Sequence, residues 1–181
     1  MKKRYLAVLI LTWLIAGCAT NQTAPTNKPI ANATLPSQAK SPKQDANQAN
    51  IDAVLKQMKG CINALDSSPS AKLVDGQILA LDQSNPNAKA LFSSSEKLTD
   101  AQVSAMVSFK KESQACRQIS NQLTNPNLRK AYQRSYAKLD RVYDDLIYKK
   151  ITIGVANQER ALLIDDFRLQ WQDEIKKQQG K

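Results

Sequence analysis

Adjacent carboxylates are the residues of this chain best suited to acid–base chemistry. Asp144-Asp145 and Asp165-Asp166 each place two acids next to each other in the sequence. A hydrolase that cleaves a glycan with carboxylates needs two of them facing each other across a cleft, whereas sequence neighbours on a helix do not share a face. We therefore interpret both pairs as solvated helix surface and keep a carboxylate-dependent hydrolase only as an alternative.

Histidine is absent from the sequence. Its absence excludes imidazole metal sites, Ser-His-Asp triads and Cys-His dyads. The sequence also contains no phosphate-cradling glycine loop and no nucleophile elbow. We predict that the chain is not an enzyme, with no catalytic residues, no metal site and no cofactor.

Cations and tyrosines interleave along one segment, a pattern typical of a surface that binds an anionic glycan or a partner helix. The side chains that we predict to form this binding face are Arg129, Arg134, Tyr136, Lys138, Arg141 and Tyr143. In the alternative interpretation the tyrosines pack at the rim of the core and the cations are simply solvated. A second candidate for a binding surface is the long loop expected over residues 84–98.

The first residues have the pattern of an export signal. Residues 1–4 are positively charged, residues 5–14 form an apolar run, and Ala16 and Gly17 are small. The apolar run is too short to span a membrane permanently. It is followed by Ile15-Ala16-Gly17-Cys18.

This tetrapeptide resembles the lipobox of bacterial lipoproteins. The resemblance implies that signal peptidase II removes residues 1–17, that diacylglycerol is joined to the Cys18 thiol, and that the new amino group is acylated. Two or three acyl chains hold a protein durably on a membrane, whereas one chain binds only marginally. Because Ala19 rather than aspartate follows the cysteine, the family's sorting rule implies an outer-membrane location, and we expect the domain to face the periplasm.

Residues 18–50 have the composition of a disordered tether behind the lipidated cysteine. Beyond Cys18 they contain no aromatic residue, include four prolines, and are rich in Asn, Gln, Thr, Ser and Ala. Such a stretch cannot bury enough apolar surface to offset its chain entropy. We expect the folded domain to comprise residues 51–181.

That domain is predicted to be all-α, an antiparallel bundle of about four main helices. Glycine is scarce and aromatic residues are 6% of the chain, which favours helices over a turn-rich sandwich or barrel. Apolar residues at steps of three and four predict helices over 51–66, with Asn50 as N-cap, and over 126–146, which has the clearest stripe. Thr99 and Gln102 form a capping box for a helix reaching Leu123. Asn125 and Thr152 are candidate N-caps of the last two helices.

A shorter helix over residues 73–81, with Gly76 inside it, is also expected. The segment 146–171 looks similar to a helix-turn-helix tail seen in many uncharacterised bacterial envelope lipoproteins. Its turn is Ile151-Thr152-Ile153-Gly154, and Asn157 and Arg160 lie beyond it. The resemblance covers a short segment and implies no activity.

The two remaining cysteines are an even pair once Cys18 carries lipid. Cys61 and Cys116 both fall on the predicted inward faces of their helices, and an exported protein meets an oxidising compartment. We expect a disulfide between them. Two free buried thiols, or a redox or metal site, are the alternatives, although no Cys-x-x-Cys motif is present.

The net charge of the chain limits the classes of partner that we expect it to bind. The formal charge is +10, and removal of Lys2, Lys3 and Arg4 with the export signal leaves +7. Attraction to anionic lipid, glycan or nucleic acid is one interpretation and a solvated lysine-rich surface the other; an exported protein rarely meets nucleic acid, so we expect no nucleic-acid partner.

The function that we favour is a lipid-anchored, non-enzymatic envelope protein that binds or scaffolds another envelope protein or the cell wall. An inhibitor of a host hydrolase such as lysozyme is a further alternative, but it needs an acidic protruding loop, and the charge of +7 argues against it.

Overall fold

The computed structural model describes residues 42–82 and 84–179. The predicted export signal, Cys18 and most of the predicted tether lie outside these residues. The described residues form helices and no strand, which confirms the all-α fold class. In chain order the helices are α1 (Pro42–Leu65), α2 (Pro69–Gln77), α3 (Ala88–Ser93), α4 (Asp100–Gln118), the short 3₁₀ helix η1 (Ile119–Gln122), α5 (Pro126–Ile147) and α6 (Ile153–Gln179).

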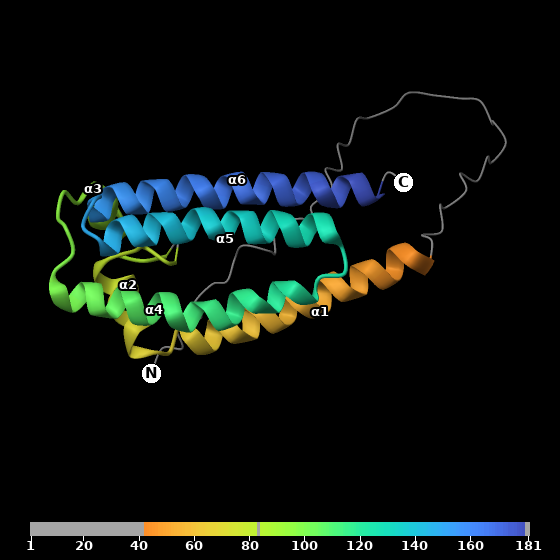
Figure 1. The fold of residues 1–181 in the computed structure, drawn as a ribbon, viewed down its shortest axis with the longest axis horizontal. Coiled ribbons are helices and arrows are strands. Elements are labelled where there is room, and N and C mark those ends of the chain that lie inside the picture. The colour runs from red at the N-terminus through yellow and green to blue at the C-terminus, as the bar shows by residue number, and fades with distance from the viewer. Residues whose placement is uncertain (1–41, 83, 180–181) are drawn as a thin grey trace, which may run out of the picture.

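The four long helices form an antiparallel bundle in two layers (Figure 1). α5 and α6 lie side by side in one layer, while α1 packs along α4 in the other. α4 also contacts α5, so it joins the layers, and α2 and α3 cover the end of the bundle at which α6 begins. The short connections before and after α5 make its sequence neighbours antiparallel to it.

Helix starts follow the predicted capping residues. Thr99 Oγ1 accepts from the Gln102 backbone N–H, and the Gln102 side chain accepts from the Thr99 backbone N–H, which completes the capping box of α4. Asn125 caps α5, with Pro126 at its first position. Thr152 Oγ1 accepts from the Val155 N–H at the start of α6. These local signals were sufficient because a cap involves only residues within one turn.

α1 begins at Pro42 rather than at Ile51, so residues 42–50 are helical and do not belong to the tether. Asn50 is consequently not an N-cap. Its side chain instead donates to the Gln122 carbonyl at 3.1 Å and accepts from the Thr124 N–H at 2.9 Å. The early part of α1 is thus held by the end of η1 and the loop that follows it. Local sequence patterns do not predict this contact, because the partners lie 72 and 74 positions from Asn50.

Two further boundaries differ from the expectation. α4 ends at Gln118 and the 3₁₀ helix η1 follows, carrying the chain to the fully buried Leu123. α2 spans Pro69–Gln77 instead of residues 73–81, because Ser68 caps it with Pro69 at the first position. The helix ends before Ile78, and the next segment is irregular but buried, comprising Ile78, Leu79 and Ala80.

The core has two clusters of buried side chains. One lies where α2 and α3 close the bundle and includes Ile78, Met106, Phe109 and Leu146. The other lies toward the opposite end, where Ile51, Leu128, Tyr132 and Trp171 bring together α1, α5 and α6. The predicted stripe of the helix at 126–147 is confirmed, since Leu128, Leu139, Val142 and Leu146 are all buried.

Cys61 of α1 and Cys116 of α4 form a disulfide, with 5.4 Å between their Cα atoms. The bond covalently joins the two helices of one layer across 55 residues of sequence. Closing a loop of this length in the unfolded chain stabilises the native state by about 4 kcal/mol on the chain-entropy model.

We expect the double substitution Cys61→Ala/Cys116→Ala to lower the free energy of unfolding by about 3–4 kcal/mol, because the unfolded chain regains that entropy. Urea titration followed by circular dichroism measures the change. Reducing the native protein with dithiothreitol should cause a similar shift and should leave the double variant unaffected. Equal midpoints for the oxidised and reduced protein would show that the bond contributes no stability.

The turn into α6 is held by close backbone contacts. Gly154 N–H donates to the Ser94 carbonyl at 3.0 Å, and Ile153 N–H donates to the Glu96 carbonyl at 2.9 Å. A Cβ atom on Gly154 would lie 2.5 Å from the Ser94 carbonyl oxygen, so only glycine fits this approach. Gly60 of α1, by contrast, has open space where a Cβ would be.

These two glycines make a matched pair. Gly154→Ala should lower the free energy of unfolding by about 1–3 kcal/mol, because the methyl group overlaps backbone that cannot yield without moving α6. Gly60→Ala should raise it by about 0.5–1 kcal/mol, since alanine favours a helix interior and nothing obstructs it. Thermal unfolding compares the two, and equal effects would contradict the close approach at Gly154.

Candidate functional site

The predicted binding-face residues of α5 separate onto two sides of the helix. Tyr143 is buried and Tyr136 packs against the core cluster that contains Tyr132. Arg134, Lys138 and Arg141 are exposed. The tyrosines and the cations therefore do not form one surface.

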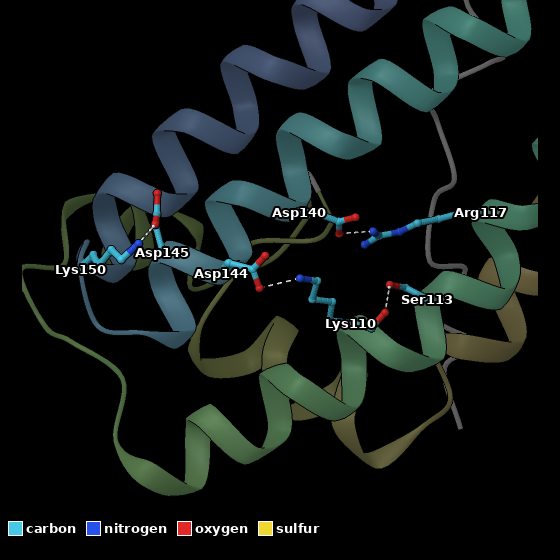
Figure 2. Close-up of polar contacts among 7 residues, drawn as sticks. All are labelled: Lys110, Ser113, Arg117, Asp140, Asp144, Asp145 and Lys150. Carbon is cyan, nitrogen blue, oxygen red and sulfur yellow. Dashed lines mark hydrogen bonds and ion pairs between the residues drawn. The ribbon is translucent and has the colours of Figure 1, made fainter.

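The tyrosine side of α5 is occupied by Arg117 of α4. The guanidinium carbon of Arg117 lies 4.7 Å from the ring centre of Tyr136 and 5.8 Å from that of Tyr143, and its Nη1 donates to Asp140 (Figure 2). A guanidinium above aromatic faces is attracted by their negative π surface. Arg117 thus fills the position that an external cation or partner would need.

The phenol groups on this side stay neutral. The hydroxyls of Tyr132 and Tyr136 lie 2.9 Å apart in a hydrogen bond, and burial raises the pKa of both phenols above its ordinary value. Tyr132 also contacts Phe167 edge-on, with ring centres 5.5 Å apart. These rings join α5 to α6 and do not face solvent as a platform.

The adjacent carboxylates each face a different cation. Asp144 accepts from Lys110 of α4 at 2.6 Å, and Asp145 accepts from Lys150 at 2.9 Å, in separate directions (Figure 2). On α6, Asp165 pairs with Arg168 at 3.2 Å, and Asp166 pairs with Lys138 at 3.0 Å. Neither pair of neighbours meets across a cleft, which agrees with the interpretation as helix surface.

The cations left on the outer side of α5 form a row that we call the α5 cation row, comprising Lys130, Arg134, Lys138 and Arg141. Their spacing of four, four and three residues aligns them on one face. Within the described part of the chain, Lys130 and Arg141 have no carboxylate within ion-pair distance. Beside them, a shallow hollow is lined by Lys130, Gln133, Arg134 and Ala137.

Arg129 does not belong to this row. Its Nη1 donates to the Leu123 carbonyl at 3.2 Å, so the side chain is turned back toward the loop that precedes α5. The contact helps to satisfy a backbone group at the end of η1. We therefore assign Arg129 a structural role.

The second predicted surface, residues 84–98, is tied to the bundle. Asn85 is buried, and its side chain donates to the backbone carbonyl and the carboxylate of Asp75. This part of the chain includes the short helix α3, and the Ser94 and Glu96 carbonyls hold the start of α6. Its charged residues are Lys89, Glu96 and Lys97, so it is not the acidic loop that a lysozyme inhibitor would need.

A cluster of three aspartates was not predicted from the sequence. Asp66, Asp75 and Asp82 lie near one another, and burial together with these two neighbours raises the pKa of Asp66. Asp75 accepts from the Leu81 N–H and Asp82 from the Ser84 N–H, at 2.9 and 2.8 Å. Asp75 and Asp82 therefore cap irregular backbone.

Over residues 42–82 and 84–179, no group of three or more acids, cysteines or histidines is arranged to hold a metal ion.

Comparison with known proteins adds nothing on function, so the argument about function rests on the residues described above. The chain matches no protein-family model, no curated protein and no solved structure. Within the described helices, none is both long enough and apolar enough to cross a membrane.

Substitution of Arg117, which contacts α5, tests these assignments. Arg117→Ala should lower the free energy of unfolding by about 2–3 kcal/mol, because it removes a charged hydrogen bond and the stacking on two tyrosines. Arg117→Lys should recover only part of this, since an ammonium lacks the planar fork. Urea titration gives the energies, and near-ultraviolet circular dichroism reports the tyrosines. The control Arg168→Ala removes an exposed pair within α6 and should cost little.

Proposed function

We propose that this chain is a lipid-anchored, non-enzymatic protein of the bacterial outer membrane that binds another envelope protein or the cell wall through the α5 cation row. The lipobox-like Ile15-Ala16-Gly17-Cys18 supports export and anchoring through Cys18. The domain would then face the periplasm on its tether. The observation that carries the binding proposal is the exposed row of Lys130, Arg134, Lys138 and Arg141 on one face of a rigid helix.

The geometry of the row suits an extended anionic partner. Lys130 and Arg141 are eleven positions apart, which is about 16 Å along a helix axis. Arginine binds carboxylates with two parallel hydrogen bonds, so Arg134 and Arg141 add directional contacts to the charge of the lysines. An acidic protein surface or an anionic wall glycan offers carboxylates at such intervals. Binding should weaken as salt is raised, because the row is exposed.

The packing behind the row also supports a binding role. α5 is fixed from the inner side by Arg117, Lys110 and the tyrosine contacts, and it packs along α6. The backbone that carries the cations is therefore held in place before a partner arrives. Preorganisation of this kind reduces the entropy lost on binding.

A charge reversal of the two row cations that have no carboxylate within ion-pair distance among the described residues tests the proposal. Lys130→Glu/Arg141→Glu keeps the Lys138–Asp166 ion pair, and it keeps Arg134, which lies beside the acids of α6. The control Lys56→Glu/Lys59→Glu makes the same change of charge on exposed residues of α1. Each full-length variant is produced in the native host, crosslinked in intact cells, and tested for pelleting with isolated cell walls. We expect the α5 variant to lose its partners and the control variant to retain them.

A further arm separates anchoring from binding. Replacement of residues 1–18 by an export signal that an ordinary signal peptidase removes should release the chain from the membrane fraction, because no acylated thiol remains, yet it should leave salt-sensitive binding to isolated walls or to the purified partner unchanged. Identical partners for the native chain and the α5 variant would overturn the binding proposal. A chain with that replacement that stays with the membrane would overturn the anchoring.

A further inference from the structure

The α5 cation row attracts anions unevenly along its length. Lys130 and Arg141 have no carboxylate within ion-pair distance in the described part of the chain. Lys138, which lies between them, is already paired with Asp166 at 3.0 Å. The row therefore attracts an anion most strongly near its two ends, which are about 16 Å apart along the helix axis.

Arg134 shares its charge with the acids of α6. It lines a second hollow, between α5 and α6, together with Asp173, Glu174 and Lys177. A hydrogen bond from Lys177 lowers the pKa of Glu174, and the positive charge of Arg134 lowers it further. Since Arg134 lines this hollow as well as the one on α5, its aliphatic stem crosses the surface of α5 between the two.

The hollow on α5 lies between the charged ends of the row and is lined mainly by carbon. Its lining comes from Lys130, Gln133, Arg134 and the exposed Ala137. The Gln133 amide is turned to Asn121 of η1, to which it donates at 3.0 Å. Lysine and arginine can cover an apolar group with their aliphatic stems while their charged ends stay in water.

The size of this hollow suits one large apolar side chain. Its volume of about 350 Å³ equals that of about a dozen water molecules in the liquid. An apolar side chain placed there removes the stems of Lys130 and Arg134 and the methyl group of Ala137 from water, and burial of apolar surface is favourable.

These features favour an acidic peptide segment over an anionic glycan. A peptide can place a carboxylate on each side of an apolar residue, which matches two end cations with an apolar hollow between them. A glycan with a carboxylate on each sugar would set further charges against the neutralised Lys138. It would also set hydroxyl groups against the hollow, where they lose hydrogen bonds to water.

We propose that the α5 cation row recognises an acidic segment of a partner protein in which an apolar side chain lies between two carboxylates. This inference rests on the proposed function, because it names the partner of the same surface. The apolar side chain enters the hollow beside Ala137, and the carboxylates contact Lys130 and Arg141. In an extended segment, acids five positions apart span about 16 Å, which is the separation of those cations along the axis.

Designed peptides test the inference without a known natural partner. The leucine probe is a fluorescent peptide with the core Glu-Ser-Leu-Ser-Ser-Glu. The serine probe has serine in place of leucine, and the lysine probe has lysine in place of both glutamates. Fluorescence anisotropy measures binding to the full chain held in nanodiscs of zwitterionic phospholipid, with empty nanodiscs as background. We expect saturable binding of the leucine probe, binding of the serine probe about fivefold weaker or more, and no binding of the lysine probe.

A variant of the hollow then locates the contact. Ala137→Gln fills the hollow with a polar side chain and exchanges one good helix former for another. It should reduce the affinity for the leucine probe to about that for the serine probe, and it should leave the serine probe unchanged, because only the leucine uses the hollow. Ala115→Gln makes the same change at an exposed position of α4 and should alter neither affinity.

Three results would overturn the inference. They are equal binding of the leucine and serine probes to the native chain, a preference for leucine that persists in Ala137→Gln, and displacement of the leucine probe by oligogalacturonate at lower concentration than by unlabelled probe. In each case the proposed function stands if Lys130→Glu/Arg141→Glu loses its cellular partners. If that variant keeps its cellular partners, the proposed function fails whatever the probes show, so the two failures are distinguishable.

Discussion

The side chain of Asn157 is the interaction on which the arrangement of this bundle most depends. It is 1% exposed, accepts from the Ala80 N–H, and donates to the carbonyls of Ile78 and Ile153, all at 2.8 Å. Residues 78–80 are buried without being helical, and buried backbone groups must be paired. One amide supplies both a donor and an acceptor to this segment, which an aliphatic residue of the same size cannot do.

The consequence is a fixed rotation of α6. Asn157 and the Arg160 contact with the Ala80 carbonyl hold the inner side of its first turns against the segment after α2, while Gly154 sets its distance from residues 92–96. Once that rotation is fixed, Trp171 enters the core. Leu162 and Leu169 must then face outward. The same rotation brings Asp166 within reach of Lys138 on α5.

The sequence predicted the features that are decided within one or two helical turns. The caps at Thr99, Asn125 and Thr152 and the apolar stripe of α5 are of this kind, and the structure confirms them. The early part of α1 is held by Asn50, whose side chain bonds to Gln122 and Thr124 far along the chain. Local helix propensity does not reveal such a contact. Residues 42–50 have a polar composition and were therefore predicted to belong to the tether.

The candidate binding face shows the same limit in its chemistry. Spacing alone could not show that Arg129 turns back to the Leu123 carbonyl, or that Arg117 of α4 occupies the faces of Tyr136 and Tyr143. On α6 the apolar residues of the two faces alternate, and without Asn157 as a reference either set fits the core. Ala156, Leu163, Phe167 and Trp171 pack into the core, and the exposed Leu162 and Leu169 also recur at a helical period, so periodicity alone does not separate the two sets.

The outer sides of α5 and α6 meet at the ion pair between Lys138 and Asp166. The 3.0 Å contact neutralises both charges at the boundary between the two helices. On α6 the two signs are mixed, since Asp173 shares a hollow with Lys177 and with Arg134 of α5. A protein surface that only needs solubility mixes the two signs in this way. The α5 cation row instead carries one sign along its whole length, and such a surface attracts anionic partners and repels cationic ones.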